Sequence, residues 1–175
     1  MRILVTGGVR SGKSTHAEAL LGDEPATYVA PGPTPDAEAD PDWAARIAAH
    51  LARRPASWST VETRDVAASV RDADRPVLVD CLGTWLTALV DDAGAWEQDS
   101  DTVHAMVVGR TDEVVDALRT CEHDVVLVTN EVGLGIVPEH RSGRLFRDLL
   151  GVVNQRVAAA CDEVHLVVAG RVLRL

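Results

Sequence analysis

The residues best suited to chemistry lie near the N-terminus, in the run Gly7-Gly8-Val9-Arg10-Ser11-Gly12-Lys13-Ser14-Thr15. This run fits the phosphate-binding pattern of a glycine, four residues, and then Gly-Lys-Ser/Thr. Glycines let successive backbone N–H groups point at phosphate oxygens, and the helix that follows directs its positive end at the same anion. Lys13 can reach the outer phosphates, and the Ser14 hydroxyl can ligate Mg²⁺. The pattern therefore predicts a binding site for a nucleoside triphosphate.

Lys13 is the only lysine of the chain, because every other one of its 17 Lys and Arg side chains is arginine. A compact ammonium fits between phosphates, where a planar guanidinium fits poorly. Because all other basic side chains except the histidines are arginines, the lysine at this position indicates that the phosphate loop is functional.

The segments on either side of the loop have the character that such a loop requires. Residues 2–6 are short and apolar and predict a buried parallel strand, whereas residues 16–21 are good helix formers. A strand, a glycine loop and a helix in this order favour phosphate binding, and a glycine-rich turn that binds nothing is the alternative.

Asp80 is a second candidate, since it ends the apolar strand predicted at residues 76–80. In phosphate-loop proteins an acidic residue at such a strand end meets the hydrated Mg²⁺. The structural alternative is that Asp80 only caps the turn that follows. With Ser14, it is our candidate magnesium ligand.

The rest of the chain alternates short apolar segments with helical ones. Further strands are predicted at residues 26–30, 59–63, 125–129, 164–168 and 171–174, and further helices at 43–54, 65–71, 84–90, 102–118 and 141–160. This alternation predicts an α/β fold with a mostly parallel sheet and helices on both faces. The last two strands flank Ala169-Gly170 and predict an antiparallel edge hairpin. We expect a single nucleotide-binding domain over residues 1–175.

Two segments lack a regular pattern. Residues 31–42 carry four prolines and four acidic side chains, so they are expected to be irregular, either as a mobile loop at the active site or as a surface excursion. Residues 91–100 are expected to form an acidic loop.

The helix predicted at residues 43–54 has an apolar row with basic side chains along its flank. The row consists of Trp43, Ile47 and Leu51, and the flank of Arg46, His50 and Arg53. Taken alone, His50 fits an ordinary helix histidine that lies beside an apolar row.

Polar residues also gather around the strongest predicted strand and the last helix. Asn130-Glu131-Val132-Gly133 follows the strand at its carboxyl end, where ligands bind in open α/β sheets. One side of the last helix carries Arg144, Arg147, Asp148, Asn154 and Gln155. This side is either simply solvated or able to meet a phosphate and a polar substrate.

Composition excludes several classes of function. The net charge of −10 argues against nucleic acid and anionic membranes as partners, so an anionic nucleotide requires positive charge concentrated in one cleft. No apolar run is long enough to span a membrane. The three cysteines are widely spaced and indicate a reducing cytoplasm. Because the N-terminal residues already predict a strand and a functional loop, we expect no signal peptide.

Several blocks together carry a resemblance to a known family. The first blocks are residues 3–14, Ala45-Arg46-Ile47 with His50, Arg54-Pro55, Trp58, and Thr60 with Glu62. The later blocks are Asp80-Cys81-Leu82, residues 128–138, Phe146-Arg147-Asp148 and Asn154-Gln155. With these blocks the chain resembles, nearly end to end, the bifunctional adenosylcobinamide kinase / adenosylcobinamide-phosphate guanylyltransferases of cobalamin biosynthesis.

The resemblance implies a RecA-type phosphate-loop fold and two activities. One phosphorylates the aminopropanol hydroxyl of adenosylcobinamide with GTP or ATP. The other transfers GMP from GTP to adenosylcobinamide phosphate, which yields adenosylcobinamide-GDP and pyrophosphate. By position, the resemblance implies that His50 carries the guanylyl group and that Arg54, Glu62 and Asp80 belong to the nucleotide site. It also implies a homo-oligomer, since the family forms trimers.

The charges around His50 fit such a role. Arg46 lies four residues before it and Arg54 four residues after it, within reach on one helix. Their positive charge is expected to disfavour the imidazolium and to help bind an incoming α-phosphate. A neutral imidazole is a good nucleophile toward phosphorus.

The chain departs from the family pattern at two places. Ala30-Pro31-Gly32 stands where the family has Ala-Thr and a small residue, so a threonine hydroxyl that contacts nucleotide is missing. Trp43 stands where methionine is expected, which alters the packing expected under His50.

Three other functions are alternatives to this interpretation. A generic small-molecule or nucleoside-phosphate kinase would explain the phosphate loop but neither His50 nor Asn130-Glu131. A regulatory GTPase needs the guanine-reading Asn-Lys-x-Asp motif, whose lysine this chain lacks. A degenerate binding protein conflicts with an intact phosphate loop and Asp80.

Overall fold

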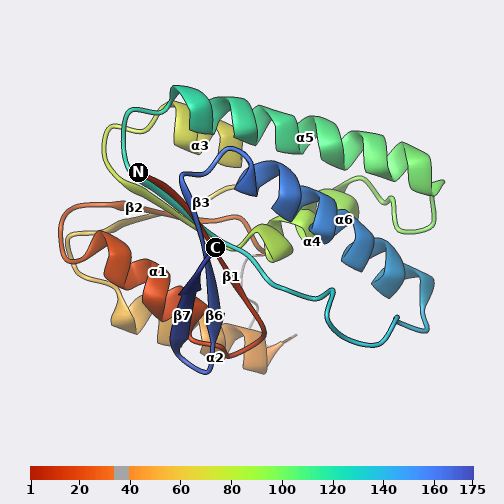
Figure 1. Ribbon diagram of the computed structural model, residues 1–175, viewed down its shortest axis with the longest axis horizontal. Coiled ribbons are helices and arrows are strands. Elements are labelled where there is room, and N and C mark those ends of the chain that lie inside the picture. Colours follow the sequence, from red (N-terminus) through yellow and green to blue (C-terminus); the bar gives the residue numbers. More distant parts are fainter. Residues whose placement is uncertain (34–39) are drawn as a thin grey trace.

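The computed structural model describes residues 1–33 and 40–175, which form a mixed sheet of seven strands (Figure 1). The strands are β1 Arg2–Gly7, β2 Thr27–Ala30, β3 Ser59–Glu62, β4 Val77–Asp80, β5 Val125–Val128, β6 Glu163–Val168 and β7 Arg171–Arg174. Their order is β3-β2-β4-β5-β1-β6-β7, and only the β6–β7 pair is antiparallel. The predicted mostly parallel sheet with an antiparallel edge hairpin is confirmed.

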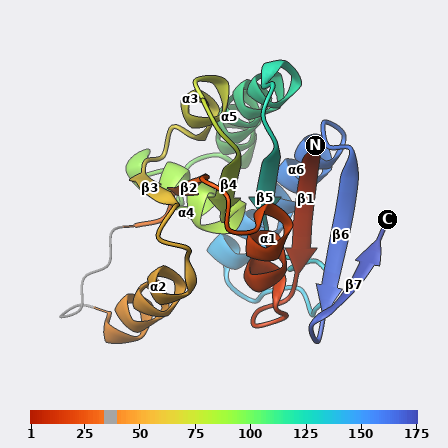
Figure 2. The same ribbon diagram turned by 90° about the vertical axis from the view of Figure 1, so that its left-hand side faces the viewer.

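Helices cover both faces of this sheet. They are α1 Lys13–Leu21, α2 Pro41–Arg53, α3 Val66–Arg71, α4 Leu82–Asp92, α5 Ser100–Thr120 and α6 Arg141–Ala158. Helices α3 to α6 lie on one face, and α1 and α2 lie on the other (Figures 1 and 2). Because side chains alternate along a strand, Leu4 and Leu127 pack toward α3–α6, whereas Ile3, Val5 and Val126 belong to the core under α1.

Several predicted helix boundaries were wrong by one or two residues. Helix α2 begins at Pro41, so the irregular segment expected at 31–42 ends earlier; its residues 34–39 lie outside the described ones. Proline suits the first turn of a helix, where its missing N–H costs no hydrogen bond. Helix α4 continues to Asp92, so the acidic loop begins two residues later than expected.

The C-terminal hairpin supports the phosphate-binding segment. Val168 pairs with Arg171, and the two residues between them, Ala169 and Gly170, have φ angles of 49° and 73°. Positive φ at both central residues is what a tight hairpin turn of type I′ requires. The N–H of Gly170 donates to the carbonyl of Ser11 at 2.8 Å, so the turn holds the loop between β1 and α1.

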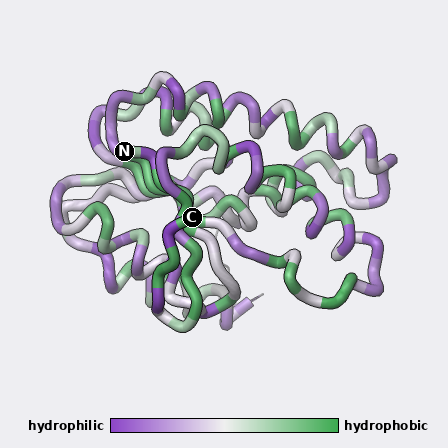
Figure 3. The backbone as a smooth tube through the Cα atoms, viewed as in Figure 1, coloured by the Kyte–Doolittle hydropathy of each residue, from purple (hydrophilic) through white to green (hydrophobic). Residues whose placement is uncertain are grey.

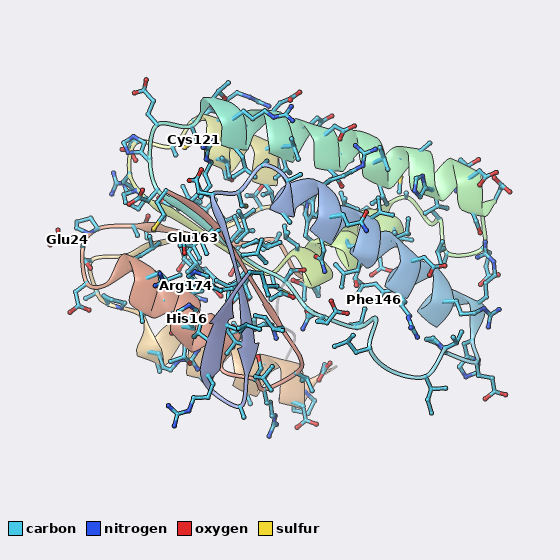
Figure 4. The ribbon with its side chains drawn as sticks, viewed as in Figure 1. His16, Glu24, Cys121, Phe146, Glu163 and Arg174 are labelled. Carbon is cyan, nitrogen blue, oxygen red and sulfur yellow. The ribbon has the colours of Figure 1, made fainter. Side chains whose placement is uncertain are left out.

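A chain of polar contacts, with the buried His165 at its centre, joins α1 to the same hairpin (Figure 4). His16 Nε2 lies 2.9 Å from His165 Nδ1, and His165 Nε2 lies 2.8 Å from Glu163 Oε2. Glu163 also faces Arg174, at 3.8 Å. Since His165 is completely buried, these contacts satisfy both of its ring nitrogens. Helix α1, which begins at the phosphate loop, is thereby fixed on β6.

Candidate active site

Residues 7–14 link β1 to α1 and have the backbone shape that the glycine pattern predicts. Gly12, the residue before α1, has a φ of 95°, a left-handed conformation that favours glycine. Gly7 lies so close to β6 that a Cβ there would be 2.4 Å from the Val167 carbonyl oxygen. The loop therefore approaches the sheet in a way that only glycine permits at these two positions.

Lys13 and Ser14 are the first two residues of α1, where backbone N–H groups have no partner within the helix. The Lys13 ammonium donates to the Gly8 carbonyl at 3.1 Å and is largely buried. The lysine thus lies across its own loop, beside the positive end of the helix. This arrangement attracts a phosphate.

The predicted site residues converge on a group of adjoining cavities. The cavity in front of the loop is lined by Lys13, Ser14, His50, Asp80 and Asn130, among others. A second one extends along the loop and adds Arg10 and Arg53. The third is lined by Tyr28, Arg54, Thr60, Glu62 and Asp80, among others. Asp80 and His50 each line two of the three cavities, so these residues form one continuous cleft.

His50 faces Asp80 across this cleft. His50 Nδ1 lies 3.7 Å from Asp80 Oδ2 and 3.4 Å from Arg53 Nη2, while Arg53 is held by Glu18 at 3.0 Å. Burial lowers the pKa of His50, Asp80 opposes that shift, and Arg53 adds to it. The imidazole is therefore neutral at pH 7, as a nucleophile must be.

The charge of Arg54 helps to lower the pKa of His50, as expected, but the side chain is held by other residues. Its guanidinium stacks on Tyr28, with Cζ 3.2 Å from the ring centroid, and Nη1 donates to the Thr60 hydroxyl at 2.8 Å. Its Nε is buried without a hydrogen-bond partner. The arginine in contact with His50 is Arg53, because α2 ends there and the chain then turns toward β3. Arg46 and Trp43 have side chains outside the described part of the structure, so the expectations about them stay untested.

Asp80 ends β4 and does not cap the next helix. The residue that precedes α4 is Cys81, whose N–H and carbonyl both contact the Thr84 hydroxyl, at 3.5 and 2.9 Å. The Asp80 side chain is only 8% exposed, and its Oδ2 has no hydrogen-bond partner among the described residues. Burial, with the Asp80 carboxylate nearby, raises the pKa of Tyr28 well above its usual range. A buried carboxylate oxygen without a partner, in a cavity that Ser14 shares, fits a divalent cation.

Sequence reasoning placed the Asn130-Glu131 block at a strand end where ligands bind, and Asn130 does line the cleft. It did not select Tyr28 and Arg53, which line the cleft as well. Tyr28 lies on β2 near its carboxyl end, so the same rule could have found it. Arg53 was noticed only as part of the helix flank. No local signal distinguishes it from Arg54.

Two arginines on the polar side of α6 bind the loop that follows β5. Arg147 donates to the carbonyls of Gly133 and Gly135 at 2.6 and 3.1 Å, and Arg144 donates to those of Pro138 and Glu139. A loop without regular structure leaves carbonyls that need donors, and these arginines supply them. Whether the two arginines also meet a phosphate stays untested.

Two features are absent from the described residues. No group of three or more His, Cys, Asp and Glu side chains there could hold a metal ion. None of the helices in residues 1–33 and 40–175 combines the length and apolar character needed to cross a membrane.

This chain is similar to known proteins over nearly its whole length. Residues 3–175 match the family described as "Cobinamide kinase / cobinamide phosphate guanyltransferase". The chain is 45% identical to the "Bifunctional adenosylcobalamin biosynthesis protein CobU" of Salmonella typhimurium and 45% identical to that of Escherichia coli, over 97% of this chain and of each relative. It is 37% identical to the "Bifunctional adenosylcobalamin biosynthesis protein CobP" of Pseudomonas aeruginosa, over 97% of this chain and 94% of the relative.

A solved structure supports the fold alone. A prototypical ATPase from the type III secretion system of pathogenic bacteria aligns with a TM-score of 0.57 at 12% identity. The alignment covers 94% of this chain and 50% of the ATPase chain. The overall fold of this chain is thus similar to that of part of the ATPase chain.

Proposed function

The chain belongs to the cobinamide kinase / cobinamide phosphate guanyltransferase family, and from this premise we propose that one nucleotide cleft serves both reactions. The protein phosphorylates adenosylcobinamide and transfers GMP from GTP to adenosylcobinamide phosphate. In the proposal residues 7–14 hold the phosphates of GTP or ATP, and Arg54, Glu62 and Asp80 complete the nucleotide site. The observation that carries it is the single cavity that Lys13, His50 and Asp80 line together.

His50 is the residue that we propose to carry the guanylyl group. The lowered pKa of His50 keeps its imidazole neutral, so one ring nitrogen has a free lone pair. This nitrogen attacks the α-phosphorus of GTP, a nitrogen–phosphorus bond forms, and the bond to the pyrophosphate oxygen breaks. A phosphate oxygen of adenosylcobinamide phosphate then attacks the same phosphorus. This second attack yields adenosylcobinamide-GDP and returns neutral His50.

Labelled GTP tests this proposal directly. With label at the α-phosphate, the wild-type protein is expected to become covalently labelled and to lose the label when adenosylcobinamide phosphate is added. With label at the γ-phosphate, the label should appear in the corrinoid and not in the protein. A protein that transfers only the γ-label would be a kinase without the second activity.

Mg²⁺ is the cation that the cleft fits, with Ser14 and Asp80 as its protein ligands. When bound, it neutralises charge on the phosphates of the nucleotide. The buried and unpartnered Oδ2 of Asp80 supports this assignment.

Asp80→Asn is expected to raise the Mg²⁺ concentration needed for half-maximal kinase rate, because an amide oxygen is a weaker ligand than a carboxylate. We expect a shift of at least about tenfold, with the melting temperature close to that of wild type. A Mg²⁺ titration at saturating nucleotide measures it. Equal half-maximal concentrations in the two proteins would remove Asp80 from the metal site.

The pH dependence of protein labelling should reflect the lowered pKa of His50. Burial shifts this pKa below its ordinary value of 6.5, so the attacking imidazole stays neutral until the pH falls through the lowered value. The initial rate of α-label uptake should therefore be constant above pH 6.5 and decline only below it. A wild-type midpoint above 6.5 would contradict this assignment.

We also propose that the protein forms a homo-oligomer, a trimer as the family resemblance implies. The loop after β5 exposes Leu134, Ile136 and Val137 to 88%, 95% and 65%, and Figure 3 shows it as hydrophobic. Arg144 and Arg147 hold its backbone, so it presents a fixed apolar surface rather than a collapsed one. Such a surface is typical of a contact with another protein chain.

Ile136→Asp is expected to shift the sedimentation mass toward the monomer, because it places a charge in the apolar contact. Val172→Asp, on the edge strand β7, is the matched control and should keep the wild-type mass. If Val172→Asp dissociates the oligomer and Ile136→Asp does not, the contact runs through the sheet edge instead.

Two further expectations remain proposals. We propose that residues 1–175 act as one domain, which the pairing of β1 with both β5 and β6 supports. We propose a reducing cytoplasm as the compartment, which the free thiols of Cys81, Cys121 and Cys161 support.

A further inference from the structure

Asn130 occupies a central place in the cleft and has no role in the reactions described so far. It is the second residue after β5, the strand that lies between β1, which leads into the phosphate loop, and β4, which ends in Asp80. Its side chain lines the cavity that also contains Lys13 and His50. The adjacent N–H of Glu131 donates to the Gly7 carbonyl at 3.1 Å, so this strand end is joined to the loop itself.

The side-chain amide of Asn130 is oriented by its surroundings. Its Oδ1 accepts from the Cys81 thiol at 3.6 Å, and a Cβ at Gly83 would lie 2.7 Å from the same oxygen. The oxygen end is thus packed against the start of α4, where only glycine leaves room for it. The reverse orientation would put the amide N–H₂ against a thiol sulfur, which is a weak acceptor.

The backbone of Asn130 is held from the other side by a second amide. Asn154 Nδ2 donates to the Asn130 carbonyl at 3.1 Å, and the Thr129 hydroxyl donates to Asn154 Oδ1 at 2.6 Å. Thr129 is completely buried, so this pair of bonds cannot exchange readily with water. Asn154 therefore acts as a positioning residue for Asn130.

These contacts leave the Nδ2 group of Asn130 available to the cavity. In the part of the chain that the structure describes, no protein acceptor is bonded to it. A neutral donor at this place can bind an anionic oxygen without adding a positive charge next to Asp80. Hydrogen bonds to charged oxygens are roughly twice as strong as those between neutral groups.

We infer that the Asn130 amide N–H₂ binds an outer phosphate oxygen of the nucleoside triphosphate. The inference rests on the proposed nucleotide cleft. Lys13 reaches the outer phosphates and shares the cavity with Asn130, which assigns Asn130 to the β- or γ-phosphate and not to the nucleoside.

Nucleotide binding without turnover tests this inference. Calorimetry with the non-hydrolysable analogue β,γ-imido-GTP in the presence of Mg²⁺ is expected to show about tenfold weaker binding for Asn130→Ala. Asn130→Asp keeps the shape and the acceptor for Cys81 but loses the donor, and it should bind the analogue more weakly than Asn130→Ala. GMP, which lacks the outer phosphates, should bind all three proteins within about twofold.

The matched control is Gln155→Ala, which removes an exposed amide from α6 next to Asn154. It should bind both ligands like wild type. Melting temperatures without nucleotide show whether Asn130→Ala has merely loosened the fold; a lower melting temperature with unchanged analogue binding would overturn the inference. Binding of the analogue by Asn130→Ala within twofold of wild type, or an equal loss for GMP, would also overturn it. A wild type that binds the analogue but transfers no phosphoryl group would instead count against the proposed function.

Discussion

Replacing His50 with alanine is expected to abolish uptake of the α-phosphate label of GTP, by at least about 1,000-fold, while transfer of the γ-phosphate largely persists. The physical reason is that alanine offers no lone pair to the α-phosphorus, whereas the loop and Lys13 still hold the nucleotide. The label on the wild-type protein should be lost in acid and survive alkali, as a nitrogen–phosphorus bond does and a serine ester does not. Uptake is measured on the denatured protein after gel separation.

His104→Ala is the matched control, because His104 lies exposed on α5. It should take up label like wild type. Uptake of α-label by His50→Ala at the wild-type rate would place the nucleophile elsewhere, and an alkali-labile bond would point to a hydroxyl group instead of an imidazole.

Lys13→Ala is expected to lower kcat/KM of both activities by about 100- to 1,000-fold, because the outer phosphates lose the charge that faces them. Lys13→Arg should recover little of this loss, since a planar fork does not fit where a compact ammonium lies across the loop. Steady-state rates of phosphoryl and guanylyl transfer measure the effect in both variants.

Arg119→Ala provides the control for a lost positive charge, since Arg119 is exposed and pairs only with Asp116 on the surface of α5. Its rates should equal those of wild type. Should Lys13→Ala lose the kinase reaction and keep the guanylyl reaction, two separate nucleotide sites would be needed, and the single cleft proposed here would be wrong.

The acidic composition and the anionic ligand are compatible because of where the basic residues lie. The chain has a net charge of −10, yet Arg10, Lys13 and Arg53 line one cavity, and Arg54 lines the adjoining one. Positive charge lining a cleft attracts an anion locally even when the molecule as a whole repels it. Nucleic acid, which needs a broad basic surface, is not favoured by this arrangement.

The amino-acid sequence by itself determined the features that depend on local pattern. The phosphate loop, the lone lysine in it, and the alternation of apolar strands with helices together predict a mostly parallel sheet with a nucleotide site at one edge. Asp80 was predictable for the same reason, because the carboxyl end of an apolar strand lies at that edge. These inferences need only the spacing of apolar residues along the chain and the backbone conformations that glycine permits.

The tertiary structure alone decided which side chains meet. His50 contacts Arg53 and Asp80, whereas Arg54 stacks on Tyr28 of strand β2. Helical spacing alone did not distinguish the two arginines. The orientation of Asn130 likewise depends on residues at positions 83 and 154, far from it along the chain. A local pattern states which face of an element a residue occupies, but the order of the strands and the docking of the helices decide what lies opposite that face.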